Sequence, residues 1–176
     1  MKNFVLISIL SFISFTAFAQ KEPKVDWLTI EEAFARTSEN PKKILIDVYT
    51  DWCGWCKRMD ATTFSDPIIA KYIMENFYPV KLDAERKDTV TVGNQTFINE
   101  NPAKKRNPHN MAIALMQGKM SYPTIVYLDE TFNIIQAVPG YQTPETIEPI
   151  LHFLNEDNYK EIPWEEYQKT FKSQLK

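Results

Sequence analysis

The stretch KILIDVYTDWCGWCK, residues 43–57, decides the fold. Its first eight residues are mostly apolar and rich in β-branched side chains, which predicts a buried strand. The only two cysteines, Cys53 and Cys56, follow at once, where we expect a helix that runs to about Thr62. The strand also holds a charged residue, Asp47, which is unexpected in a buried position.

The spacing of the two cysteines indicates thiol chemistry. At the start of a helix, free backbone N–H groups and the helix dipole stabilise an anion, so the pKa of the Cys53 thiol should be lowered. Cys56 lies one turn deeper, and its sulfur can attack a mixed disulfide on Cys53. A bridge between them would close only a four-residue loop and add little stability, which favours a reactive pair over a structural one.

The rest of the chain alternates helix and strand signals. Capping residues at Thr29, Asp66, Asn107 and Thr143 predict four more helices, the third of which should end at Gly118. Strands are expected at 77–83, 124–128 and 134–138, a small hairpin at 89–98, and an amphipathic helix at 163–175. This order predicts an α/β fold with a mixed sheet and helices on both faces. The first two strands should be parallel and the last two antiparallel.

Composition excludes several classes of protein. The chain has 176 residues, a net charge of −3 and 44% hydrophobic residues, which is ordinary for a folded domain. The mild acidity argues against nucleic-acid binding, and the basic cluster at 104–106 is interpreted as a solvated loop. His109 and His152 lack the spacing of metal ligands, so no metal site is expected and both are interpreted as surface or helix-face residues.

The N-terminus has the pattern of an export signal. A positive start, an apolar run and small residues before Gln20 predict a signal peptide at 1–19, so the protein should be periplasmic or secreted. The run is short for a membrane span, which needs about 20 residues, and an uncleaved anchor is the alternative. Residues 20–28 follow as an extended leader.

Two motifs resemble the thioredoxin superfamily: WCGWCK after an apolar strand, and SYPT, residues 121–124, before another. The resemblance covers roughly residues 29–155 and implies a three-layer fold with a mixed four- to five-stranded sheet. The domain is expected at 29–157 with an insertion at 84–107, followed by a helical extension at 158–176. The CGWC motif in place of CGPC, together with these two additions, indicates an exported subgroup of the family.

The resemblance implies roles for individual residues. Pro123 should follow a cis peptide bond and face the cysteine pair. Asp47 matches the buried carboxylate that takes a proton from the resolving Cys56, and Lys81 matches the lysine beside that carboxylate. Burial should raise the pKa of Asp47, whereas Lys81 should lower it. Gly140 matches the glycine that closes the substrate groove.

Four further residues are candidates for substrate contact: Trp52, Gly54, Trp55 and Tyr122. Exposed aromatic side chains beside a reactive thiol can bind a substrate, or they can simply cover the site. The sequence leaves both alternatives open for the two tryptophans and for Tyr122. The bulky Trp55 should also change the redox properties of the pair, in a direction that the sequence does not determine.

These patterns favour a thiol–disulfide oxidoreductase that acts on protein disulfides, with Cys53 as nucleophile and Cys56 as resolving thiol. The reductive direction is expected, with a thiol or a membrane protein as electron donor, no cofactor, and a monomeric protein. Two alternatives stay open. One is a disulfide oxidase or isomerase. The other is a redox-gated binding module, in which the insertion or the tail docks a partner and the cysteines switch the binding.

Overall fold

A computed structural model describes residues 23–175, so the predicted signal peptide at 1–19 and the first leader residues lie outside the described part. The main sheet has four strands in the order β2-β1-β5-β6. These strands are β1 (Ile44–Tyr49), β2 (Tyr78–Asp83), β5 (Thr124–Leu128) and β6 (Ile134–Pro139). β1 and β2 are parallel, whereas β1–β5 and β5–β6 are antiparallel, which confirms the predicted mixed sheet.

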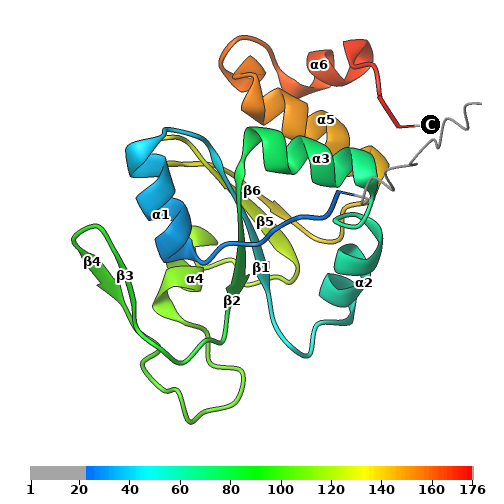
Figure 1. Ribbon diagram of the computed structural model, residues 1–176. Helices are drawn as coiled ribbons and strands as arrows, with labels where there is room; N and C mark the ends of the chain where they lie inside the picture. Colours follow the sequence, from blue (N-terminus) through cyan, green and yellow to red (C-terminus); the bar gives the residue numbers. More distant parts are fainter. Residues whose placement is uncertain (1–22, 176) are drawn as a thin grey trace, which may run out of the picture.

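Helices cover both faces of this sheet (Figure 1). They are α1 (Ile30–Glu39), α2 (Gly54–Thr62), α3 (Pro67–Asn76), α4 (Asn110–Leu115), α5 (Pro144–Asn155) and α6 (Trp164–Thr170), with a 3-10 turn, η1 (Asn158–Lys160), before the last. α1 and α4 pack on one face, and α3 and α5 pack on the other. This confirms the expected three-layer α/β arrangement. Within the described residues, no helix has both the length and the apolar character needed to cross a membrane.

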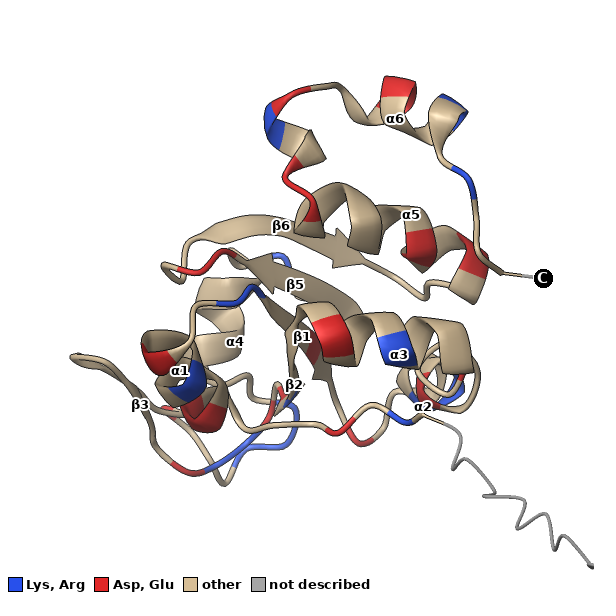
Figure 2. Cartoon of the chain, turned by 45° about the horizontal axis from the view of Figure 1, so that its top comes forward, with Lys and Arg blue, Asp and Glu red and all other residues tan. Residues whose placement is uncertain are grey.

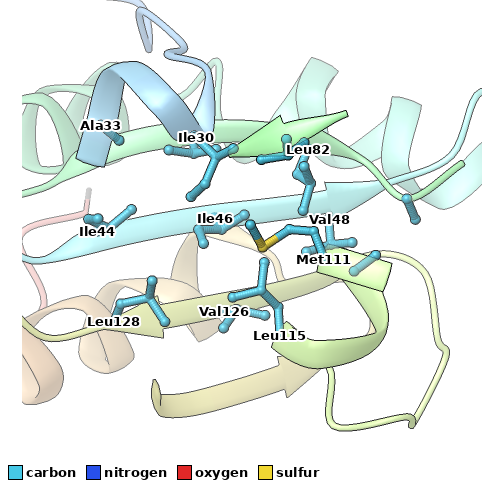
Figure 3. Packing of buried hydrophobic residues seen from close by; sticks show 14 of the residues in the cluster. Ile30, Ala33, Ile44, Ile46, Val48, Leu82, Met111, Leu115, Val126 and Leu128 are labelled. Carbon is cyan, nitrogen blue, oxygen red and sulfur yellow. The ribbon is translucent and has the colours of Figure 1, made fainter. Parts of the chain in front are cut away.

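The alternation of side chains along β1 divides the interior into two cores. Ile44, Ile46 and Val48 join the core between the sheet and the helices α1 and α4 (Figure 3). Leu45 belongs to the other core, together with side chains of α2, α3 and α5. Because Asp47 is two residues from Leu45, its side chain points toward the same face as Leu45.

Local capping explains where three of the helices begin. The Thr29 hydroxyl accepts a hydrogen bond from the Glu32 N–H, and the Glu32 carboxylate accepts one from the Thr29 N–H, which is a capping box. The Asp66 carboxylate accepts from two N–H groups of the first turn of α3, which begins at Pro67. Thr143 caps α5. The three predicted helix starts are therefore confirmed.

The predicted start of α4 is wrong. We expected Asn107 to cap this helix, but α4 begins at Asn110 and is shorter than predicted at both ends. Its N-cap is His109, whose Nδ1 accepts a hydrogen bond from the Met111 N–H at 3.1 Å. The other ring nitrogen, Nε2, lies 2.9 Å from the carbonyl oxygen of Asp88. His109 is fully buried, so its interpretation as a surface or helix-face residue is also wrong.

The tail after α5 is held by a buried carboxylate. α6 ends at Thr170, so the helix predicted over 163–175 is too long at its C-terminal end. Beyond α6, Glu148 of α5 accepts hydrogen bonds from the Ser173 hydroxyl at 2.5 Å and from the Gln174 backbone N–H at 2.6 Å. Glu148 is only 2% exposed, and the tail supplies a donor to each of its oxygens.

The predicted insertion contains the predicted hairpin, formed by β3 (Val90–Val92) and β4 (Gln95–Phe97). The hairpin lies beside α1 (Figure 1). At its turn, Gly93 has a φ of +58°, and a Cβ atom there would lie 3.1 Å from the Phe34 ring. Glycine therefore serves both the turn and the close approach of α1.

We predict that His109→Ala lowers the free energy of unfolding by about 1–3 kcal/mol, because it removes the helix cap and leaves the buried Met111 N–H without its partner. His109→Asn should lose less, because asparagine is also a good N-cap. Urea unfolding of the three proteins measures both effects. Equal stability of His109→Ala and the unsubstituted protein would contradict the proposed importance of this cap.

Candidate active site

Cys53 and Cys56 form a disulfide bond at the start of α2. Cys53 is the N-cap residue of this helix, and its Sγ accepts a hydrogen bond from the Cys56 backbone N–H at 3.1 Å. The same N–H group and the positive end of the helix dipole would stabilise a Cys53 thiolate after reduction. Cys53 is 5% exposed and Cys56 is 1% exposed, so Cys53 is the more accessible of the two.

A partly buried ion pair lies on the face of the sheet that carries α2 and α3. Asp47 of β1 stands opposite Lys81 of β2 in the parallel register. The Lys81 ammonium donates to Asp47 Oδ2 at 2.5 Å, whereas Oδ1 has no hydrogen-bond partner among the described residues. Asp47 is fully buried, and this burial raises its pKa to about 6 against the opposing effect of Lys81.

The Lys81 ammonium makes a second ion pair, with Asp60 of α2. The rings of Trp27, Tyr49 and Phe64 surround it, with their centres 5.0, 5.0 and 5.6 Å from Nζ. Burial lowers the pKa of Lys81, but the two carboxylates outweigh burial and the net change is an increase. The lysine therefore stays charged beside the buried carboxylate. Through its two ion pairs, Lys81 links β2 to β1 and to α2.

The Tyr122–Pro123 peptide bond is cis, as the resemblance implied. Pro123 immediately precedes β5, and its carbonyl oxygen accepts a hydrogen bond from the Gly140 N–H at 2.8 Å. Gly140 has a φ of +91°, a backbone conformation that residues with side chains rarely adopt. The structure thus brings the SYPT motif and Gly140 together at one end of the β5–β6 hairpin.

Trp52 joins the CGWC loop to the SYPT motif. Its ring meets the Tyr122 ring edge to face, with centroids 5.8 Å apart. The Trp52 indole N–H donates to Glu85 at 2.8 Å, and the Arg106 guanidinium lies over the Trp52 ring, 4.7 Å from its centre. Trp52 is still 49% exposed, so a large part of the ring faces solvent beside the disulfide.

Trp55 belongs to a second aromatic group. Its ring centroid lies 5.4 Å from that of Tyr141, and the Arg58 guanidinium lies 5.7 Å from the Trp55 centre and 5.9 Å from the Tyr141 centre. Trp55 is 57% exposed. A Cβ atom on the neighbouring Gly54 would meet nothing within 4 Å, so the surrounding contacts do not require glycine there.

Five residues of this surface were not predicted from the sequence to belong to the site: Asp60, Glu85, Arg58, Arg106 and Tyr141. A signal existed for Asp60, which follows Cys56 by four residues and so shares its helix face. Glu85 and Arg106 reach Trp52 from the insertion, and no local spacing could have revealed that contact. Arg106 is exposed, as its interpretation as part of a solvated loop implied, but it is also stacked on a tryptophan.

Between residues 23 and 175, no group of three or more His, Cys, Asp or Glu side chains is arranged so that it could hold a metal ion. The second histidine, His152, lies on α5, and its ring is tilted by 34° against that of Tyr72 at a centroid distance of 4.0 Å. Its Nδ1 lies 2.8 Å from a carboxylate oxygen of Glu156.

A cysteine disulfide at the start of a helix, a carboxylate–lysine pair and a cis-proline loop together define a class, the thioredoxin-like domains. The chain belongs to the family of thioredoxin-like domains, whose family model matches residues 30–155.

Relatives with curated names are partial matches. The thiol:disulfide interchange protein DsbD of Haemophilus influenzae is 31% identical over 107 residues, which are 60% of this chain and 15% of DsbD. An uncharacterized protein of Archaeoglobus fulgidus is 28% identical over 80 residues, or 46% of this chain and 63% of that protein. This chain thus spans about 15% of the length of DsbD.

Solved structures support the fold. A thioredoxin-fold protein from Helicobacter pylori has a TM-score of 0.56 at 19% identity, with 79% of this chain and 91% of that chain covered. A putative disulphide-isomerase from Bacteroides thetaiotaomicron has a TM-score of 0.54 at 20% identity, with 76% and 96% covered. The oxidoreductase DsbH also has a TM-score of 0.54, at 15% identity, with 76% and 85% covered.

We predict that Asp47→Asn stabilises the oxidised protein at pH 8 by about 1–3 kcal/mol. The pKa of Asp47 is about 6 in the folded protein against 3.8 ordinarily, so the folded state binds more protons between these values. The contribution of Asp47 to stability therefore falls as the pH rises from about 4 to 7, and the substitution should remove this dependence.

Guanidinium unfolding at pH 5 and pH 8 tests this prediction. Glu148→Gln is the matched control, because that buried carboxylate accepts two hydrogen bonds and its replacement should destabilise the protein. Loss of stability in Asp47→Asn at pH 8 would show that the ion pair with Lys81 outweighs burial of the carboxylate.

Proposed function

We propose that this protein is a thiol–disulfide oxidoreductase that reduces disulfide bonds of protein substrates in the cell envelope. The observation that carries the proposal is the Cys53–Cys56 pair at the start of α2, in a fold that also buries the Asp47–Lys81 pair on the α2 side of the sheet. The predicted signal peptide supports the location. The similarity to DsbD, a thiol:disulfide interchange protein, supports the class of reaction.

The first step is attack by Cys53. In the reduced protein, the Cys53 thiolate attacks one sulfur of the substrate disulfide, and the other substrate sulfur leaves as a thiolate that takes a proton from water. A mixed disulfide now joins Cys53 to the substrate. The Cys56 N–H group, which donates to Cys53 Sγ in the oxidised protein, would also donate to the thiolate and stabilise it before the attack.

The second step is resolution by Cys56. Asp47, with a pKa of about 6, accepts the proton of the Cys56 thiol at neutral pH. The Cys56 thiolate then attacks Cys53 Sγ, the second substrate sulfur leaves and is protonated, and the Cys53–Cys56 disulfide forms. Two electrons pass from the protein to the substrate, and Lys81 holds the carboxylate in place throughout.

The surfaces around the pair have complementary roles in this proposal. The backbone on either side of the cis bond at Pro123 offers hydrogen bonds to an extended substrate, and Gly140 closes the substrate groove. Trp52, Trp55 and Tyr122 contact the substrate through their exposed rings, and Gly54 leaves space beside the disulfide. A thiol or a membrane electron donor then reduces the disulfide again. The protein acts as a monomer.

We predict that Cys56→Ser traps substrates, because the mixed disulfide on Cys53 forms but cannot be resolved. Non-reducing gels of envelope extracts should show covalent adducts that disappear with dithiothreitol. Cys53→Ser is the control and should form none, since it lacks the nucleophile. The proposed exchange mechanism is wrong if the two variants give the same pattern.

We further predict a reduction potential near −270 mV for the Cys53–Cys56 pair, the value of thioredoxin, because a reductase must give up its electrons readily. Equilibration with defined thiol buffers, read by alkylation of free thiols, measures it. A value between about −180 and −120 mV would favour an oxidase or isomerase instead. Tight binding of a partner that survives loss of both cysteines would favour a redox-gated binding module.

A further inference from the structure

The insertion reaches the disulfide through Trp52. Glu85, at the start of the insertion, accepts the Trp52 indole N–H at 2.8 Å, and Arg106, near its end, places its guanidinium 4.7 Å from the ring centre. Figure 2 shows the basic residues of the loop between β4 and α4 as a blue stretch beyond the end of β2. Both ends of the insertion therefore contact the same exposed ring beside the cysteine pair.

Hydrogen bonds within the insertion fix the position of Arg106. Asn99, which is 7% exposed, donates to the carbonyl oxygens of Arg86 and Asn107 and accepts from the Asn107 side chain, which ties the two ends of the insertion together. The His109 N–H donates to the Ala84 carbonyl at 2.7 Å. Between these ties, Arg106 has a φ of +58°, a left-handed conformation that is uncommon for arginine.

A second arginine flanks the other tryptophan of the motif. Arg58, on α2, lies over Trp55 and Tyr141, as described above. A guanidinium held near an aromatic face by cation–π attraction keeps N–H groups that can still donate hydrogen bonds. Trp52 directly precedes Cys53 and Trp55 directly precedes Cys56, and an arginine lies over each of these exposed rings.

These two arginines differ from other cations near the site. Lys81 pairs with two carboxylates, and so does Arg86. Within residues 23–175, neither Arg58 nor Arg106 has a carboxylate within 4.0 Å. Asp51, the exposed acid that directly precedes Trp52, forms no ion pair with either arginine. The Glu85 carboxylate accepts a hydrogen bond from the Trp52 indole N–H instead. A planar guanidinium group can bind a carboxylate through two parallel hydrogen bonds. A substrate with carboxylates would therefore supply the ion-pair partner that each of these arginines lacks.

We propose that Arg106 and Arg58 are specificity residues that bind carboxylates flanking the disulfide of the substrate, so that acidic disulfide-bearing segments are preferred. The proposal rests on the proposed exchange reaction. It gives the insertion a role, because the insertion delivers Arg106 to the reaction site. The exposed faces of Trp52 and Trp55 hold the apolar part of the same segment.

The test uses two synthetic peptides, each with one intramolecular disulfide. One carries glutamate on both sides of each cysteine, and the other carries glutamine at the same positions. The protein is first reduced with dithiothreitol and desalted, and the second-order rate constant of one turnover is measured from thiol release. For the unsubstituted protein, we expect the acidic peptide to react about fivefold faster at low ionic strength, the effect of an ion pair worth about 1 kcal/mol.

Arg106→Asn is the informative variant, because asparagine tolerates the left-handed conformation of this position while the charge is lost. The ratio of the two rate constants should fall toward one, and further with Arg58→Gln added. Lys105→Gln is the matched control: it removes the same charge from the neighbouring residue and should keep the ratio. Salt at about 0.5 M should also reduce the ratio, because it screens exposed charges.

The outcomes separate the two proposals. If neither peptide is reduced, the exchange reaction itself is wrong. If both are reduced at equal rates, or if Lys105→Gln lowers the ratio as much as Arg106→Asn, the exchange reaction stands and the assignment of Arg106 is overturned. A circular dichroism melt of each variant confirms that a change in the ratio does not come from unfolding.

Discussion

The ion pair between Asp47 and Lys81 is the constraint on which the site depends. A buried carboxylate without a partner is costly, so a strand that carries one must align with a strand that supplies the cation. The parallel register of β1 and β2 meets this need by placing the two residues opposite each other. A slip of one residue would turn Asp47 toward the apolar core of α1 and α4 and away from Lys81. The register that satisfies the charge also puts it on the α2 side, where the cysteines are.

The fold keeps this chemistry separate from what holds it together. Two apolar cores, one on each face of the sheet, supply the packing, while the Cys53–Cys56 bridge closes a loop too short to restrain the unfolded chain much. Opening and closing of the bridge can therefore proceed with little effect on stability. The same separation explains why an acid with a raised pKa is tolerated at position 47. Apolar packing elsewhere in the domain offsets the free energy lost by burying this carboxylate.

The parts of the fold that could be predicted from the sequence are those encoded locally. The capping box at Thr29, the Asp66–Pro67 helix start and the β-branched run before the cysteines each need only neighbouring residues. The failures have a common physical origin. His109 caps α4 because Asp88, far along the chain, offers its buried ring a hydrogen-bond partner, and no periodicity reports such a contact. Lys81 could be placed beside Asp47 only through resemblance, whereas its second partner, Asp60, required the packing of α2 on the sheet.

The insertion shows most clearly what local patterns omit. Read alone, residues 104–106 are three adjacent cations and indicate a solvated loop. Their neighbours in space differ from their neighbours in sequence: Asn99 closes the loop, the loop turns Arg106 into a left-handed conformation, and the guanidinium meets a tryptophan of the CGWC motif. A reaction centre can thus acquire a selective surface without any change in its reacting groups, because a segment inserted between β2 and β5 is enough to bring a charge to the edge of the site. This is how one fold supports many partners: the strands hold the chemistry, and the connecting segments determine what may approach it.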